Sequence, residues 1–207
     1  TTDNVGWIQS VQYGTAVKPL ALQPSGGNVG IGTTGPSSKL DVTTAGLAAT
    51  QTTSSGLALV NTTAATAIAP VQISPAVRWS GFGWKTDVTA ASQAVDFREY
   101  VVPVQGAANP TGYLSWGSSV NGAAYSDGQM VLTSTGNVGI GTTTPSNLLS
   151  VYSATAATMG FTGGGTKDVW SMGYDVTNNR FAIASSSSIT SNVRMVIDNQ
   201  GNVGIGT

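Results

Sequence analysis

The chain has 207 residues, of which only 8% are charged against roughly 25% in an ordinary soluble domain, and its net charge is −1. It contains no histidine and no cysteine, which excludes Ser-His-Asp and thiolate catalysis, His-ligated zinc, disulfides and iron–sulfur clusters. The balance of 8 Lys and Arg against 9 Asp and Glu offers no basic face for phosphates, so we expect no nucleic-acid partner.

Residues 1–37 are expected to be the end of one β-module followed by a first connector. The chain opens with Thr1-Thr2-Asp3-Asn4, without a methionine or a basic-then-apolar leader. No apolar run approaches the ~20 residues that cross a bilayer, so we expect no membrane insertion. Val5, Trp7 and Val11 are expected in strands, because they are β-formers in a stretch with no helical periodicity.

One phrase, Gly-Asn-Val-Gly-Ile-Gly-Thr, begins at Gly27, at Gly136 and again at Gly201. Its uneven spacing argues against a regular solenoid and for a connector that joins modules of different size. A short alternating run comes first, Gly-Asn then predicts a tight turn, and Val-Gly-Ile-Gly predicts a strand with its glycines on one face. Pro36 and Pro145 end that strand because proline cannot donate to a ladder, and a further strand then begins.

The glycine face of this connector strand is expected to be a contact surface. Glycine weakens a strand, so two glycines at alternate positions predict that another backbone approaches closely there. Since the unit has little apolar surface of its own, we expect identical chains to meet at this face around a shared axis. The residues assigned to the connectors are Gly27, Gly30, Gly32, Gly136, Gly139, Gly141, Gly201, Gly204, Gly206, Pro36 and Pro145.

The first connector also matches G-x-G-x-x-G, the phosphate-binding pattern of dinucleotide sites, from Gly30 to Gly35. A dinucleotide site needs a helix after the pattern, whereas Pro36 and a strand-like run come next here. The second copy replaces the last glycine with Thr144. We therefore expect no nucleotide, and no other cofactor is assigned.

Residues 38–70 are rich in Thr, Ala and Ser, which leaves two interpretations open. A disordered linker is one. The alternation Leu57-Ala58-Leu59-Val60 favours the other, thin strands with small side chains.

Residues 71–130 are expected to form a β-module that contains most of the aromatic residues. Trp79, Phe82, Trp84, Tyr100 and Trp116 offer flat apolar rings on which sugars can stack, and they are the candidate glycan-binding residues. The alternative is that they fill the core of a thin sheet. Strand alternation places Phe82 and Trp84 on one face and Trp79 on the other, so one flat strand cannot bury all three.

The same module contains the main cluster of charges. Two carboxylates can hydrolyse a glycosidic bond, but alternation directs Asp96 and Arg98 to one face and Glu99 to the other. With Lys85 and Asp87 nearby, salt bridges or subunit contacts are favoured over catalysis. No catalytic residue is assigned, and we do not expect an enzyme.

Residues 131–151 are expected to be the second connector, and residues 152–207 a meander of strands with a turn at Asn178-Asn179 that leads into the third. Asp168 and Asp175 are expected in turns, and no Asp-rich calcium loop occurs, so no metal site is assigned. No helix-length amphipathic pattern appears anywhere. The sequence therefore predicts an all-β chain.

The second connector, from Gly136 to Ser146, resembles the one found in bacteriophage tail fibre and tailspike-like proteins, often upstream of an intramolecular-chaperone endosialidase domain. The stretch from Val77 to Pro110 is also similar to a module of such fibres. The resemblance implies an elongated, intertwined β-structured homotrimer, located in the virion tail fibre and thus extracellular. It further implies a non-catalytic structural and host-attachment role toward cell-surface glycans or proteins.

Two other functions stay open. The connector phrase also occurs in bacterial and other extracellular surface filaments and adhesins, and some tailspikes are polysaccharide depolymerases. The chain stops inside the repeated phrase, and Gly-Ile-Gly-Thr placed before its opening Thr1-Thr2 would resemble the second connector. We therefore expect a segment of a longer repetitive protein.

Overall fold

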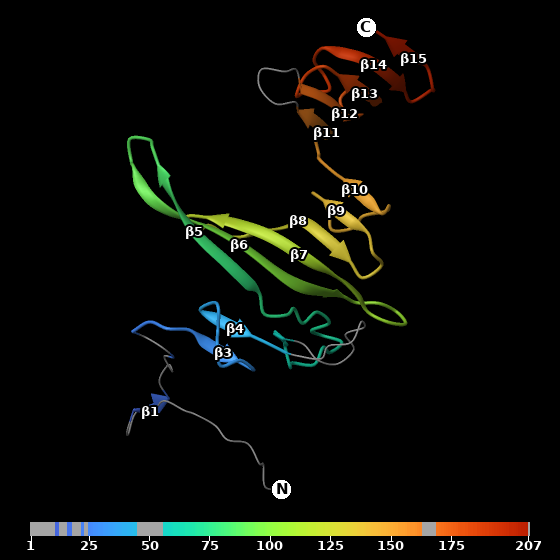
Figure 1. Ribbon diagram of the computed structural model, residues 1–207. Coiled ribbons are helices and arrows are strands. Elements are labelled where there is room, and N and C mark those ends of the chain that lie inside the picture. Colours follow the sequence, from blue (N-terminus) through green and yellow to red (C-terminus); the bar gives the residue numbers. More distant parts are fainter. Residues whose placement is uncertain are drawn as a thin grey trace. The chain divides into compact units, whose positions relative to one another are not determined.

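The computed structural model describes residues 11–12, 16–17, 22, 25–44, 56–162 and 169–206. Every regular element in these ranges is a β-strand, which confirms the all-β prediction for the described part of the chain (Figure 1). The chain divides into two compact units, Thr1–Ala58 and Leu59–Thr207. The predicted strand residues Val5 and Trp7, and the predicted turn residue Asp168, lie outside the described residues.

The first unit contains two short strand pairs. Strand β1 (Val11–Gln12) pairs antiparallel with β2 (Ala16–Val17), which confirms the expected strand at Val11. Strand β3 (Val29–Ile31) lies in the first connector and pairs with β4 (Leu40–Val42) in parallel.

The second unit contains a six-stranded sheet with the order β10-β9-β8-β7-β6-β5. Neighbours are antiparallel except β9 and β10, which run parallel. The turn after β7 contains Asn121 and Gly122 at φ 55° and 72°, the positive values that a tight Asn-Gly hairpin turn requires. The strands are β5 (Val77–Lys85), β6 (Ala91–Val104), β7 (Thr111–Val120), β8 (Ser126–Thr133), β9 (Val138–Ile140) and β10 (Leu149–Val151).

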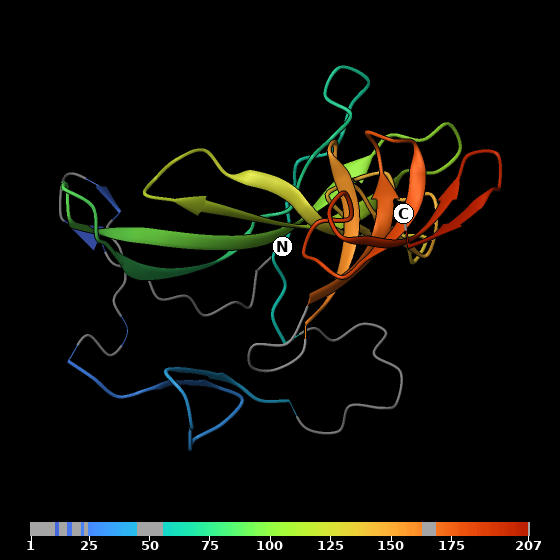
Figure 2. The same cartoon turned by 90° about the horizontal axis from the view of Figure 1, so that it is seen from above.

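One end of this sheet is a two-stranded tip. Strand β7 pairs with β6 only from Val95 to Val104, so the segments 82–85 and 91–94 form a two-stranded ladder, which Asn121 joins through one hydrogen bond to the Ala94 carbonyl over 2.8 Å. Figure 2 shows this green hairpin reaching beyond the other strands of its sheet. Side chains on both faces of the tip therefore have few neighbours.

A five-stranded antiparallel meander comes next, with the order β11-β12-β13-β14-β15, as the sequence predicts. The expected turn at Asn178-Asn179 joins β12 and β13, and Asn179 has φ 49°. The strands are β11 (Ala156–Thr162), β12 (Val169–Asp175), β13 (Arg180–Ala184), β14 (Val193–Asp198) and β15 (Val203–Ile205).

The thin strands expected around Leu57–Val60 are absent, and this prediction is wrong. Residues 56–70 contain only an isolated bridge between Thr66 and Ala69. Leu57 and Val60 are 68% and 67% exposed, so the alternating apolar residues bury too little surface to hold a sheet.

Candidate interaction surfaces of the two sheets

The repeated phrase folds into the same hairpin in its second and third copies. Strands β8 and β9 pair with Val131 opposite Gly139, and β14 and β15 pair with Val196 opposite Gly204. Gly136 and Gly201 each occupy their turn at φ 88°, a value that favours glycine. The predicted order of strand, turn and glycine-striped strand is confirmed for both copies.

After this strand, the first two copies add a parallel strand in the same register. Val29 lies opposite Leu40 in one copy, as Val138 lies opposite Leu149 in the other. The loop between the two strands is tied back at its proline. The side-chain amide of the connector asparagine donates to the proline carbonyl over 2.9 Å from Asn28 to Pro36 and 3.2 Å from Asn137 to Pro145. The predicted proline break and following strand are confirmed.

The close backbone approach predicted at the glycines exists, but the approaching backbone belongs to the same chain. A Cβ atom on Gly139 would clash with the carbonyl oxygen of Thr142, and one on Gly141 would clash with that of Tyr152. Gly139 is buried within the single chain. The expectation that identical chains meet at the glycine face is therefore wrong at Gly139, because the chain's own loop fills that space.

The face of the six-stranded sheet opposite to that of Gly139 is exposed and apolar. Trp79 and Phe97 lie directly opposite each other in β5 and β6 and are 52% and 55% exposed. Glu99 and Ser118 are polar interruptions within it. We call this surface the first apolar face; the registers place on it Val77, Trp79, Val95, Phe97, Val101, Leu114, Trp116, Val120, Met130, Leu132, Val138, Ile140, Leu149 and Val151.

The five-stranded sheet repeats this arrangement. Its inner face includes small side chains, among them the fully buried Ala182 and Ala184, and the loop 185–192 closes over them. Ile189 of that loop is 1% exposed, and the Ser171 hydroxyl donates to the Ser186 carbonyl over 2.8 Å. We call its other side the second apolar face; it comprises Met159, Phe161, Trp170, Met172, Tyr174, Phe181, Ile183, Met195, Ile197, Val203 and Ile205.

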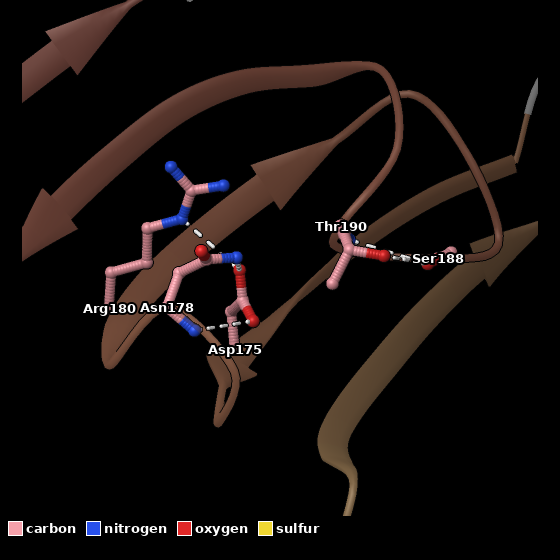
Figure 3. A network of polar contacts seen from close by, with 5 residues as sticks. All are labelled: Asp175, Asn178, Arg180, Ser188 and Thr190. Atoms are coloured by element: carbon pink, nitrogen blue, oxygen red, sulfur yellow. Dashed lines mark hydrogen bonds and ion pairs between the residues drawn. The ribbon is translucent and has the colours of Figure 1, made fainter.

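Asp175 lies buried on the inner side of this sheet at the β12–β13 turn, and Figure 3 shows its contacts with Asn178 and Arg180. Its buried carboxylate accepts hydrogen bonds from the Asn178 backbone and side-chain amides over 3.2 and 2.7 Å, and from Arg180 Nε over 3.2 Å. Burial alone would raise the pKa of Asp175, but the bonds from Asn178 and Arg180 outweigh it and hold the pKa below its ordinary value. The expected turn role of Asp175 is confirmed.

The structure does not gather the five candidate aromatic residues on one surface. Trp79 and Trp116 lie on the first apolar face, whereas Phe82, Trp84 and Tyr100 lie on the other, as alternation predicts for the three residues of β5. Phe82 and Trp84 are 78% and 68% exposed at the two-stranded tip. The alternative that the β5 aromatics fill a core within the chain is therefore wrong.

Two hollows include residues that sequence reasoning did not select, among them Phe97 and Asp127. A hollow of about 460 Å³ is lined by Trp79, Phe97 and the glycines of β5. A polar groove of about 880 Å³ is lined by hydroxyl and amide side chains of the second connector loop together with Asp127 and the exposed Tyr152. The alternation in β6 could have identified Phe97, but the groove depends on how the connector loop returns to β8.

Three members of the predicted charge cluster, Lys85, Asp87 and Arg98, form ion pairs within the chain. Lys85 Nζ lies 2.9 Å from a carboxylate oxygen of Asp87, and Asp96 and Glu99 point to opposite faces as predicted. Arg98 forms an ion pair with Asp127. Sequence reasoning missed Asp127, because this contact depends on the register of three strands.

The absence of a side chain at Gly117 leaves room for that ion pair. A Cβ atom on Gly117 would clash with the Asp127 carboxylate, so the glycine of β7 leaves the space in which Arg98 and Asp127 meet. The guanidinium also lies over the rings of Tyr125 and Tyr100, 4.0 and 5.0 Å from their centroids. The bond from Arg98 holds the pKa of Asp127 below its ordinary value.

Among the described residues, no three acidic side chains lie close enough together to hold a metal ion. Within the same ranges, the structure contains no helix long and apolar enough to cross a membrane. No protein-family model and no curated protein matches the chain.

Proposed function

We propose that the chain is a non-catalytic structural segment of an extracellular fibre, whose copies associate as a homotrimer through the two apolar faces. The observation that supports this proposal is the exposure of large apolar side chains on one face of each sheet, for example Phe97 at 55% and Phe161 at 53%. Soluble monomers rarely leave a contiguous apolar patch larger than a few hundred Å² in water. Contact between identical copies removes such a patch from water.

The charge distribution is compatible with close contact between copies. The chain has a net charge of −1, so identical copies repel one another little. The first apolar face contains Glu99 and, at the end of β5, Lys85 as its charged residues within the described strands. Depletion of charge at the centre of a surface is typical of protein interfaces.

We further propose that the fibre attaches to a host-cell glycan or protein, in the manner of the phage tail fibres that the connector resembles. Phe82 and Trp84 support this role, because their exposed rings lie on one face of the two-stranded tip. The polar groove beside the second connector adds hydroxyl and amide groups that can bind sugar hydroxyls. A depolymerase gains no support from the carboxylates Asp96 and Glu99, which point apart.

The association is tested by the mass of two matched variants in solution, with circular dichroism as a control for folding. Phe97→Glu places a charge on the first apolar face, and Phe82→Glu places one on the opposite face of the same hairpin. Light scattering should give a single-chain mass of 20.9 kDa for Phe97→Glu and three times that mass for Phe82→Glu. Equal masses for the two folded variants would contradict the proposed contact surface.

A further inference from the structure

The edge of β15 that faces away from β14, here called its outer edge, differs from the corresponding edge in the other two copies of the connector. In the first copy this edge of β3 pairs with β4, and in the second copy this edge of β9 pairs with β10. In residues 56–162 and 169–206, β15 pairs with β14 alone. The three copies have the same sequence, so the first two show what such an edge accommodates.

The hydrogen bonds that join the parallel strand identify the backbone groups involved. The Val138 amide donates to the Leu148 carbonyl over 2.8 Å, as the Val29 amide donates to Lys39 over 2.9 Å. The Ile140 carbonyl accepts from the Tyr152 amide over 2.9 Å. The Val203 amide and the Ile205 carbonyl are the corresponding groups of β15. An unpaired strand edge of this kind is a template for strand addition.

The side chain of Ile205 in β15 is more exposed than its counterparts in the two copies that have a parallel strand. Ile205 is 80% exposed, against 44% for Ile140 in β9. Gly206 has φ 70°, close to the 74° of Gly141. A Cβ atom on Gly141 would clash with the Tyr152 carbonyl after β10, whereas one on Gly206 would meet nothing within 4 Å. The third copy thus has the backbone conformation that accommodates the added strand, with an open space beside it.

Among the described residues, the Asn202 side chain uses one of its donor hydrogens and leaves the other for such a strand. Its counterparts Asn28 and Asn137 donate to the carbonyls of Pro36 and Pro145. The side-chain amide of Asn202 donates to Asp198 over 2.8 Å. Because an amide nitrogen has two donor hydrogens, the second one can bind a proline carbonyl in the same way.

We propose that the outer edge of β15 is a docking site for a parallel strand of the pattern Pro-Ser-x-x-Leu-x-Val, joined to β15 through a loop like 141–148. The strand would accept a hydrogen bond from the Val203 amide, donate one to the Ile205 carbonyl, and cover the side chain of Ile205. This site does not depend on the proposed trimer, because β4 and β10 dock within a single chain.

The test adds a copy of residues 143–153 directly after Thr207 and measures amide hydrogen exchange. We expect exchange at Val203 to slow by about tenfold or more, because its amide becomes paired. The Gly206 amide is the internal control, since it already donates to the Arg194 carbonyl over 2.9 Å and should change little. Unchanged exchange at Val203 in the folded, extended protein would overturn the proposal.

Two further measurements decide what occupies the edge. The same extension with Asp at the positions copied from Leu149 and Val151 should lose the protection of Val203, because it cannot cover β15 with apolar side chains. Protection that survives in this variant would contradict the proposed sequence pattern. Without any extension, protection of Val203 that rises with protein concentration would instead assign the edge to a second copy and overturn the proposal.

Discussion

The two faces of the six-stranded sheet are covered in opposite ways, and two neighbours in β8 illustrate the difference. Val131 is fully buried on the inner face, while the larger Met130 is 39% exposed on the first apolar face. In β7, Ser115 is 1% exposed, although the adjacent Trp116 is only partly covered. Small residues thus lie inside the chain and large apolar ones outside, the reverse of the usual distribution in a monomer. Within the single chain, the large apolar side chains of this face are therefore left exposed, and the proposed association of copies would cover them.

The largest loss of stability is expected when a side chain is added on the inner face of the six-stranded sheet, which the chain's own loop covers. Gly139→Val should lower the free energy of unfolding by about 3 kcal/mol or more, because its Cβ would clash with the Thr142 carbonyl. Gly81→Val is the matched control, since a Cβ there meets nothing within 4 Å, and it should change stability little. Thermal or urea unfolding measures both. An equal loss of unfolding free energy in the two variants would contradict the difference between the inner face and the first apolar face.

A second prediction removes the buried carboxylate from the inner side of the five-stranded sheet. Asp175→Ala should cost about 3 kcal/mol, because it leaves Arg180 and the Asn178 amides without their buried acceptor. Asp87→Ala removes an exposed partner of Lys85 and should cost less than about 1 kcal/mol. Urea unfolding compares them. A cost for Asp175→Ala no larger than that for Asp87→Ala would contradict the closure of this face.

The stability of the fold should depend on pH through two aspartates, Asp127 and Asp175. Asp127 and Asp175 both have lowered pKa values in the folded chain, so the unfolded chain binds protons first as the pH falls. Their stabilisation is complete above the ordinary aspartate pKa and is lost as the pH falls through the folded values. Asp127→Asn should weaken this acid dependence, as measured by unfolding between pH 7 and about pH 2. An unchanged dependence of the unfolding free energy on pH would exclude the ion pair with Arg98 as a source of the acid sensitivity.

The smallest effect on stability is expected at the tip. Trp84→Ala should change the free energy of unfolding by no more than about 0.5 kcal/mol, because the ring is 68% exposed. It should leave the particle mass unchanged and reduce adsorption to host cells or their surface glycans. Adsorption is compared with that of Gly83→Ala, its neighbour on the other face. Full adsorption of Trp84→Ala would remove this residue from the candidate binding surface.

Much of the local structure could be predicted from short patterns. The connector was predictable because Gly-Asn, alternate glycines and a proline each restrict the backbone within a few residues. The opposite faces of Phe82 and Trp79 followed from alternation alone. The turn at Asn179 followed from residue types that tolerate positive φ.

The features that could not be predicted depend on register between distant strands. The meeting of Arg98 with Asp127 needs β6, β7 and β8 in alignment, and the pairing of β7 with β8 shifts register between Trp116 and Ser118. The same holds for Gly139, whose neighbour is the chain's own loop and not a second chain. Single-strand patterns show that a glycine has a close neighbour but not which backbone supplies it.

The central claim, that copies meet through the apolar faces, is tested most directly by hydroxyl-radical footprinting of the native particle. Trp79 and Trp84 lie on opposite faces of the same strand and are 52% and 68% exposed in the single chain. Contact through the first apolar face predicts that Trp79 is protected in the particle while Trp84 remains reactive. Comparable reactivity of the two tryptophans would contradict it.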